Sequence, residues 1–286
     1  MIRYVGRNSA MKNAESRFPI LLAEKIFPIL LQAGEIQMKY FGKTLEVKHK
    51  TSSVDTVTIA DKMTDDFLRD KFSKMFPKDF ILSEENANIP KEYSKTVWII
   101  DPLDGTNEFI AQGKNFSIII GKCVSGKPVF GMVYAPAMKM MWFAEHGKGA
   151  YEYTLRTGEL KKIHVSKISD IKESRLIVRR SKDAREWDIF PASLDVKERI
   201  KLGGSGIKMA KIASGEFDIH INTYNTASKW DTCGPQIIIE EAEGKITDFK
   251  GRELDYTQEN LTWKDSYFVT NGKLHKKVHD TIRVKR

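Results

Sequence analysis

Residues 98–109, which read WIIDPLDGTNEF, constrain the fold of this chain more than any other segment. Residues 97–100 are β-branched or aromatic with no polar interruption, which is typical of a short buried strand. Pro102 cannot donate a hydrogen bond to a sheet, so we expect it to end that strand. Gly105 and Thr106 then predict a turn that opens a helix, where free backbone N–H groups favour an anion.

Two carboxylates, Asp101 and Asp104, lie where the predicted sheet ends and the helix begins. In α/β proteins this is the usual position of a ligand site. Asp, Pro and Gly are also common in an ordinary surface turn, which is the alternative interpretation. Because the aspartates directly follow an apolar strand, we expect at least one to be partly buried and to need a partner. No Lys or Arg lies between Lys95 and Lys114, so these residues favour a metal or phosphate site over a plain turn.

The composition is that of a soluble globular protein, with 41% hydrophobic and 30% charged residues. The 286 residues can bury a substantial core in one large domain or two smaller ones. The net charge of +9 is spread along the chain, and no basic run is interleaved with aromatic residues. We therefore expect a solvated basic surface and no nucleic-acid partner, with steering of an anionic substrate as the weaker functional alternative.

The location of the protein is predicted from its cysteines and its apolar segments. Cys123 and Cys233 are too few for a disulfide framework and lack the spacing of a metal site. No segment reaches the roughly eighteen apolar residues of a membrane span. Residues 1–17 are polar, lack the core of a signal peptide, and are expected to form an N-terminal extension. These observations predict a cytoplasmic protein with no membrane span.

Hydrophobic periodicity predicts an alternation of helices and strands. The predicted helices cover residues 19–41, 61–76, 182–190, 202–213 and 230–243, and the predicted strands cover residues 80–82, 97–100, 116–124, 128–134, 140–145, 149–153, 175–178, 217–221 and 245–249. We expect residues 46–58 to be extended around a polar loop at 48–53. The strands between 116 and 153 should form an antiparallel meander, and the polar stretch 154–162 could mark a subdomain boundary.

Carboxylates occur at four predicted strand or helix ends: at Asp61, at Glu84 with Glu85, at Asp101 with Asp104, and at Asp231. Each could be a cap, a turn residue or a solvent-facing acid. If they converge, an all-oxygen set is what Mg²⁺ or Mn²⁺ selects, whereas zinc favours His or Cys. The chain contains no H-E-x-x-H, G-x-S-x-G or P-loop pattern, which disfavours the corresponding chemistries.

Three ordered motifs together carry a resemblance to a known family: SEE at 83–85, DPLDGT at 101–106 and WDT at 230–232. The chain resembles the inositol monophosphatase superfamily of Mg²⁺-dependent, lithium-sensitive phosphatases over about residues 19–270. Within it, the chain is most similar to the 3′(2′),5′-bisphosphate nucleotidases, which hydrolyse 3′-phosphoadenosine 5′-phosphate to AMP. The resemblance implies a layered αβαβα sandwich with one catalytic domain at 18–286, subdomains at about 18–153 and 154–286, and a possible homodimer.

The resemblance also implies roles for individual residues. It implies two or three Mg²⁺ ions, with Mn²⁺ as a possible substitute, held by Glu84, Asp101, the Leu103 carbonyl, Asp104 and Asp231. Asp231 also belongs to the implied substrate-binding set. The backbone N–H groups of Gly105 and Thr106 would bind the scissile phosphate. Asp61 and the Thr106 hydroxyl would orient and deprotonate the attacking water, and Ser205 and Lys208 would hold a second phosphate.

The implied substrate is a small phosphorylated metabolite, and its class depends on a few positions. Inositol phosphatases usually carry a glutamate seven residues before the motif aspartate, where this chain has Tyr224, which cannot accept from two hydroxyls as a carboxylate does. Residues 204–208, 228–233 and 104–109 are closer to the nucleotidase pattern. Asn107 and the segment 180–182 depart from it. The alternatives are an inositol, sugar or NADP phosphatase on the same scaffold, or a non-catalytic module that binds Mg²⁺ or phosphate.

Overall fold

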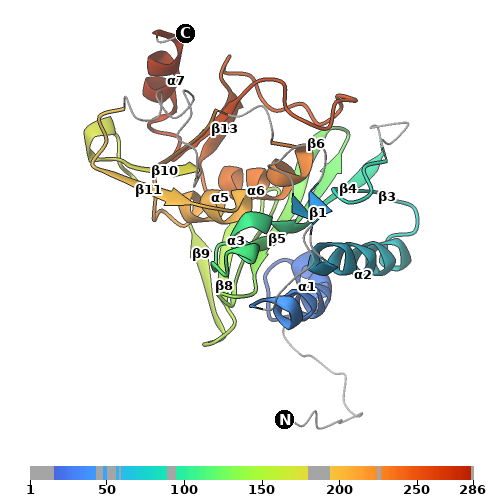
Figure 1. Ribbon diagram of the computed structural model, residues 1–286. Coiled ribbons are helices and arrows are strands. Elements are labelled where there is room, and N and C mark those ends of the chain that lie inside the picture. The colour runs from blue at the N-terminus through green and yellow to red at the C-terminus, as the bar shows by residue number, and fades with distance from the viewer. Residues whose placement is uncertain are drawn as a thin grey trace.

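Helices and sheets alternate in five layers in the computed structural model of the protein (Figure 1). The structure describes residues 16–42, 48–49, 56–57, 59–88, 95–179, 194–223 and 227–284. The predicted layered α/β sandwich is confirmed. In Figure 1 the first two helices lie at one end of the molecule and the last helix lies at the opposite end.

The first two layers are a pair of helices and a seven-stranded sheet. Helices α1 (Leu21–Tyr40) and α2 (Ile59–Met75) pack on one face of the sheet. Its strands follow each other in chain order: β3 (Phe80–Ser83), β4 (Thr96–Asp104), β5 (Ser117–Val124), β6 (Lys127–Ala135), β7 (Met140–Glu145), β8 (Ala150–Thr154) and β9 (Glu159–Ile163). Only the pairing of β3 with β4 is parallel, so the predicted antiparallel meander is confirmed.

The remaining layers are two central helices, a five-stranded sheet and a C-terminal helix. Helices α5 (Ser205–Ala213) and α6 (Lys229–Glu241) are packed between the two sheets. The second sheet has the order β11 (Glu198–Leu202), β10 (Arg175–Arg179), β12 (Ile219–Asn222), β14 (Tyr267–Thr270), β13 (Lys245–Asp248). Helix α7 (His275–Val284) covers its outer face. The short elements are α3 (Thr106–Ile110), η1 (Ile171–Glu173) and the strand pair β1 (Lys48–His49) and β2 (Thr56–Val57).

The apolar run in β4 is explained by burial on both faces of the sheet. Trp98 and Ile100 pack into the cluster under α1 and α2. Val97 and Ile99 point to the opposite face and pack into the cluster around α5 and α6. Since side chains alternate along a strand, Asp101 continues the face that looks toward the central helices.

The expectation that Pro102 ends this strand is wrong. Asp101 pairs with Ile119 and Asp104 with Ser117, so β4 carries one extra residue between these pairs. Such a bulge lets a proline stay inside a strand, because the residue at the bulge donates no ladder hydrogen bond. The carbonyl of Pro102 instead accepts a hydrogen bond of 2.6 Å from Gln37 Nε2 of α1.

Other expectations also differ from the structure. The polar stretch 154–162 does not leave the first sheet, because residues 159–163 form β9 and pair with β8. Residues 245–249 do not hold the last strand, since β14 and α7 follow. The helix predicted at 61–76 should present Met63, Leu68, Phe72 and Met75 on one apolar face; in α2, Leu68 and Phe72 are buried, but Met63 and Met75 are 42% and 39% exposed. Residues 1–15 of the extension predicted at 1–17 and residues 50–53 of the loop predicted at 48–53 lie outside the described residues, as do the helix predicted at 182–190, the segment 180–182 and Tyr224.

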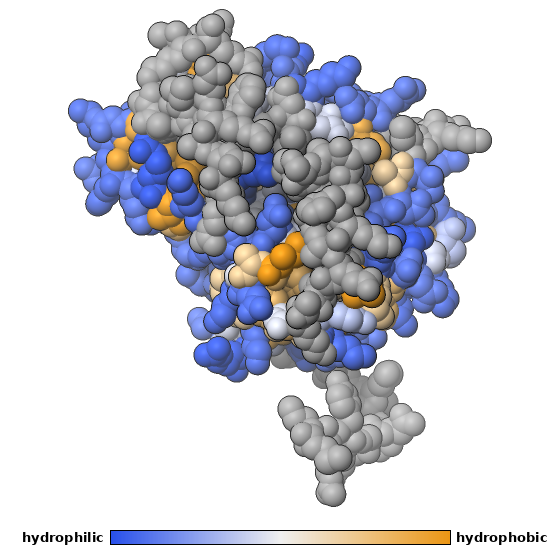
Figure 2. All heavy atoms as spheres, viewed as in Figure 1, coloured by the Kyte–Doolittle hydropathy of each residue, from blue (hydrophilic) through white to orange (hydrophobic). Residues whose placement is uncertain are grey.

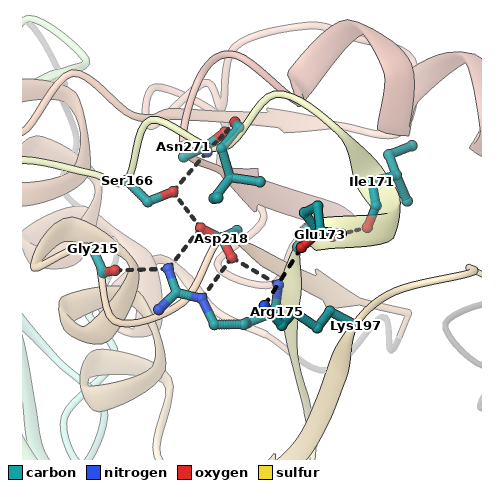
Figure 3. Close-up of polar contacts among 10 residues, drawn as sticks. Ser166, Ile171, Glu173, Arg175, Lys197, Gly215, Asp218 and Asn271 are labelled. Carbon is teal, nitrogen blue, oxygen red and sulfur yellow. Dashed lines mark hydrogen bonds and ion pairs between the residues drawn. The ribbon is translucent and has the colours of Figure 1, made fainter.

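An ion pair between a buried aspartate, Asp218, and a partly exposed arginine, Arg175, ties the second sheet together (Figure 3). Asp218 is fully buried at the start of β12 and accepts hydrogen bonds from the backbone N and the guanidinium of Arg175 on β10. Ser166 donates to the same carboxylate and accepts from Asn271 Nδ2. The network therefore joins the loop after β9 to three neighbouring strands of the sheet.

The face of the molecule shown in Figure 2 is mostly hydrophilic where described residues form it. Large hydrophobic side chains that are exposed in the described part of the chain are Leu21, Met38, Ile59, Met63, Met75 and Val124. Among the same residues, no helix combines the length and the apolar character needed to cross a membrane.

Candidate active site

The register of β3 and β4 brings two of the predicted acidic residues together. Ser83 pairs with Ile100 in this parallel ladder, and Glu84 N donates to Ile100 O at 3.2 Å. Glu84, which follows the last residue of β3, therefore lies beside Asp101, which is still within β4. Asp61 lies in the first turn of α2 and is 2% exposed. The charges of Glu84 and Asp61 both act on the Asp101 carboxyl.

Three aspartates from two elements form the centre of the site. One carboxylate oxygen from each of Asp101, Asp104 and Asp231 lies within 4.8 Å of the others. Asp101 and Asp104 stand on either side of the bulge in β4, and Asp231 lies in the first turn of α6. The bulge has a direct consequence, because it changes the alternation of side chains and allows both β4 carboxylates to reach the same place.

Backbone and hydroxyl donors hold each of these carboxylates in a fixed orientation. Leu103 N donates to Asp101 Oδ1 at 3.0 Å, and Ser228 N donates to Asp231 Oδ2 at 2.6 Å. Asp104 accepts at both oxygens: Ser205 N binds Oδ1 at 2.6 Å, while Gly206 N and Ser117 Oγ bind Oδ2 at 2.9 and 2.7 Å. Partners of this kind orient metal-binding carboxylates and tune their basicity.

Two glycines bring the starts of α3 and α5 against the same carbonyl. Gly105 has a φ of +84°, and Gly204 has a φ of +63°. A Cβ at Gly105 would lie 2.8 Å from Asn115 O and 3.3 Å from the Cα of Gly204, and one at Gly204 would lie 2.7 Å from the same oxygen. Only glycine accommodates this approach. The N-terminal ends of α3 and α5 therefore both open beside Asp104.

Burial and mutual repulsion shift the pKa values of the three aspartates. The pKa of Asp101 is raised well above its usual range by burial, then by the charges of Glu84 and Asp104. Burial, with the Asp104 charge, raises the pKa of Asp231 to about 6. Burial also raises the pKa of Asp104, although hydrogen bonds from Ser117 and Ser205 oppose this. The site thus concentrates negative charge that it does not fully compensate.

Lys208 supplies a buried positive charge beside this cluster. Its side chain is carried by α5, and the residue is 5% exposed. Burial lowers the pKa of Lys208 to about 8, an effect that the Asp104 charge opposes. The Lys208 charge in turn acts on the pKa values of both Asp104 and Asp231. One ammonium group cannot balance five neighbouring carboxylates.

The residues present fit a hard divalent cation. The cluster offers carboxylate oxygens, their orientation is fixed by neighbouring donors, and their pKa values are raised by burial and by one another's charges, which a bound cation would offset. Oxygen-only donor sets are typical of Mg²⁺ and Mn²⁺, while zinc and copper prefer His or Cys.

The structure places the other predicted residues around this centre. Gly105 precedes α3, and Thr106 begins it. The Thr106 hydroxyl donates to Leu103 O at 3.1 Å, so its single proton is not directed to Asp61 in this conformation. Ser205 contacts Asp104 through its backbone and Asp231 through its hydroxyl. The predicted residues from five separate chain segments therefore lie around the ends of β3 and β4.

Sequence reasoning missed residues that support this site. Ser117 binds Asp104 from the start of β5, and no local pattern distinguishes it from any other serine. Tyr267 is fully buried on the unpredicted strand β14, and its hydroxyl lies near Ser205 and Asn222. Glu108 is 5% exposed, and its charge acts on Lys208. No local pattern predicts the burial of Glu108, because the short helix α3 also contains the polar residues Thr106 and Asn107.

Comparison with known sequences identifies a family. The model of the inositol monophosphatase family matches residues 23–283. The chain is 31% identical over 247 residues to 3′(2′),5′-bisphosphate nucleotidase CysQ of Aggregatibacter actinomycetemcomitans, covering 84% of this chain and 90% of that protein. It is 30% identical over 234 residues to inositol monophosphatase 3 of Solanum lycopersicum, covering 79% of this chain and 85% of that protein.

Solved structures show the same architecture. An IMPase of Thermotoga maritima superposes with a TM-score of 0.80 at 26% identity, covering 93% of this chain and 98% of that one. An inositol monophosphatase from Anabaena superposes with a TM-score of 0.75 at 24% identity, covering 92% of this chain and 96% of that one.

Proposed function

The chain belongs to the inositol monophosphatase family, and we propose that it is a Mg²⁺-dependent 3′(2′),5′-bisphosphate nucleotidase. Its reaction would convert 3′-phosphoadenosine 5′-phosphate and water to AMP and phosphate. The observation that carries the proposal is the convergence of Asp101, Asp104 and Asp231 within 4.8 Å, next to the buried Lys208. A phosphatase of this family acts on a dianionic group, which carboxylates alone would repel.

The acidic cluster would hold two or three Mg²⁺ ions, with Mn²⁺ as a possible substitute. The proposed ligands are Glu84, Asp101, the Leu103 carbonyl, Asp104 and Asp231. When bound, such ions acidify a water molecule and balance the charge on the attacking and leaving oxygens. The orientation of Asp104 by Ser117, Ser205 and Gly206 supports its assignment as a ligand.

The residues at the start of α2 and α3 would bind and activate the reactants. The backbone N–H groups of Gly105 and Thr106 would bind the scissile phosphate. Asp61, buried beside Asp101, would accept a proton from the attacking water, and the Thr106 hydroxyl would orient that water. This last role requires the hydroxyl to turn away from the Leu103 carbonyl, which accepts it in this conformation.

Lys208 and Ser205 would bind the second phosphate of the nucleotide. The buried ammonium of Lys208 favours an anion at this place, whereas the first two backbone N–H groups of α5 already bind Asp104. An inositol monophosphate has no second phosphate, so it would gain less from these groups. The similarity to nucleotidases supports this substrate class, while the similarity to inositol monophosphatases at nearly equal identity keeps an inositol, sugar or NADP phosphatase as the alternative.

A turnover comparison tests the substrate class. Phosphate release is measured from 3′-phosphoadenosine 5′-phosphate and from inositol 1-phosphate, with Mg²⁺ alone and with Li⁺ added. We expect a higher kcat/KM for the nucleotide and inhibition by Li⁺. A higher kcat/KM for the inositol ester would overturn the nucleotidase proposal and leave the family assignment intact.

A matched pair of lysine variants tests the second phosphate site. Lys208→Ala should raise KM for bisphosphorylated nucleotides more than KM for monophosphates. Lys211→Ala on the same helix is the control, because Lys211 forms an ion pair with Glu216 away from the cluster. Equal effects of Lys208→Ala on both substrate classes would show that Lys208 does not bind the second phosphate.

A non-catalytic module that binds Mg²⁺ or phosphate is the alternative from another class. Asp101→Asn should lower the rate of phosphate release by several orders of magnitude, because it removes a central metal ligand. Unchanged activity in this variant would refute the metal assignment. We further propose a cytoplasmic location and a possible homodimer, which fractionation and light scattering would test.

A further inference from the structure

Asp65 is a buried carboxylate that the proposed mechanism does not use. It lies on α2, one turn after Asp61, and is 2% exposed. Its Oδ1 accepts a hydrogen bond from the hydroxyl of Ser83, which is fully buried at the end of β3. Its Oδ2 accepts from Arg69 Nε at 2.7 Å. Both oxygens of Asp65 are thus directed at protein donors and not at the aspartate cluster.

Stability alone does not explain this arrangement. The ion pair of Asp65 with Arg69 contributes little net stability, because the Arg69 side chain is 31% exposed and desolvation of the buried carboxylate offsets the attraction. What the two contacts of Asp65 do supply is a fixed geometry. The Ser83–Asp65 hydrogen bond joins α2 to the end of β3, which is the edge strand of the first sheet.

The end of β3 is where Glu84 begins. Glu84 is partly exposed, in contrast to Asp101 and Asp104, which are 2% and 5% exposed on the paired strand β4. The backbone N–H of Glu84 is held by its hydrogen bond to Ile100 O. The residue before it, Ser83, is held to α2 by the hydrogen bond from its hydroxyl to Asp65. Because i and i+4 residues share a helix face, the same face of α2 presents Asp61 to Asp101 and Asp65 to Ser83.

We propose that Asp65 is a positioning residue for the metal site, acting through Ser83 to hold Glu84 and through α2 to hold Asp61 at their distances from Asp101. Arg69 balances the charge of Asp65, so that this carboxylate orients its neighbours without joining the cluster. The proposal rests on the metal cluster that the proposed function uses, and it is independent of which phosphate ester is hydrolysed.

Direct Mn²⁺ binding to the full-length protein without substrate tests this inference, with free Mn²⁺ followed by electron paramagnetic resonance. Ser83→Ala removes the hydroxyl donor, and Asp65→Asn removes the charge while keeping the shape. Loss of a residue that orients a ligand typically weakens metal affinity about 10- to 100-fold, and we expect an effect of this size in both variants. Circular dichroism and melting temperature verify that each variant is folded.

Asp66→Asn is the matched control, because Asp66 is 75% exposed and binds the same arginine at 2.6 Å. It should leave Mn²⁺ affinity unchanged. Wild-type affinity in a folded Ser83→Ala variant would overturn the proposal, even if Asp65→Asn failed to fold. An equal loss in Asp66→Asn would also overturn it, since the effect would then belong to Arg69. Absence of Mn²⁺ binding by the unmodified protein would overturn the metal assignment and this inference with it, whereas a change of preferred substrate would overturn only the nucleotidase proposal.

Discussion

The backbone N–H of Ser205 donates to Asp104 Oδ1 across 2.6 Å, although 101 residues separate the two in the chain. This contact joins the bulged end of β4 to the first residue of α5, and so joins the first sheet to the central helical layer. The carboxylate at this junction is also one of the three that converge. The three converging carboxylates therefore lie where the first sheet meets the central helical layer.

Replacing Asp101 should stabilise the metal-free protein. The pKa of Asp101 is raised by burial and by four neighbouring carboxylates, so an ionised Asp101 is unfavourable in the folded state. Asp101→Asn should raise the melting temperature in EDTA by a few degrees, roughly 1 kcal/mol for a chain of this size. Scanning fluorimetry with EDTA and then with excess Mg²⁺ measures this. Mg²⁺ should stabilise the wild type more than the variant, and a lower melting temperature of the variant in EDTA would contradict the argument.

The stability of the metal-free protein should depend on pH through Asp231. Burial and the Asp104 charge raise its pKa from 3.8 to about 6 in the folded state. The folded state therefore binds the proton more tightly than the unfolded state, and this group lowers stability as pH rises from about 4 to above 6. The size of the change is on the order of 3 kcal/mol.

Comparison with Asp231→Asn isolates this contribution. Burial lowers the pKa values of His220 and His275 to about 3, which opposes the trend by lowering stability as pH falls below about 6.5. Both histidines remain in the variant, so the difference between the two proteins removes their effect. In EDTA, the stability of Asp231→Asn relative to wild type should increase from pH 4 to pH 7. A pH-independent difference would show that Asp231 does not titrate in this range.

Breaking the ion pair of the second sheet should destabilise the fold. Asp218→Ala leaves the Arg175 guanidinium and the backbone N–H of Arg175 without their buried acceptor. We expect a loss of about 3 kcal/mol in the free energy of unfolding by urea. Asp280→Ala is the control, since its ion pair with Lys276 is exposed and should contribute at most about 0.5 kcal/mol. Similar losses in both variants would mean that the Asp218 network contributes no more to the free energy of unfolding than an exposed ion pair does.

A methyl group at Gly204 should impair both folding and the site. The residue has a φ of +63°, and an added Cβ would lie 2.7 Å from Asn115 O and 3.1 Å from Asp104 Oδ2. Gly204→Ala should therefore lower the melting temperature and weaken Mn²⁺ binding. Gly147→Ala is the control, because its φ is similarly positive, at +75°, while no atom lies within 4 Å of the added Cβ. If the two variants behaved alike, backbone strain alone would explain the loss.

The antiparallel meander from β5 to β8 was predictable because its information is local. Each strand is a short apolar run, and Gly- or Pro-containing turns separate neighbours that also pair with one another. The four acidic positions of the candidate site were also visible, since each carboxylate stands at the end of a predicted element. The resemblance to a known family then implied that these carboxylates belong to one metal-dependent phosphatase site.

The second sheet was less predictable because its pairing is non-local. Strand β14 lies between β12 and β13, although it follows both in the chain. Strand β11 is polar at most positions because it lies at the edge of that sheet. Strand β14 is a four-residue run of aromatic and β-branched residues, but no tight turn joins it to β13, and β11 has neither an apolar run nor such a turn. The bulge at Pro102 was missed for a related reason, since only the partner strand β5 defines the register that it interrupts.

The sequence by itself determined which residues could bind a cation and a phosphate, because the chemistry of carboxylate oxygens and of glycine-rich helix starts is local. Tertiary structure alone decided that these groups converge. The parallel register of β3 and β4, the bulge in β4 and the approach of α5 to Asp104 set their distances. Burial then raised their pKa values, an effect that depends on every layer packed around them and that no single segment contains.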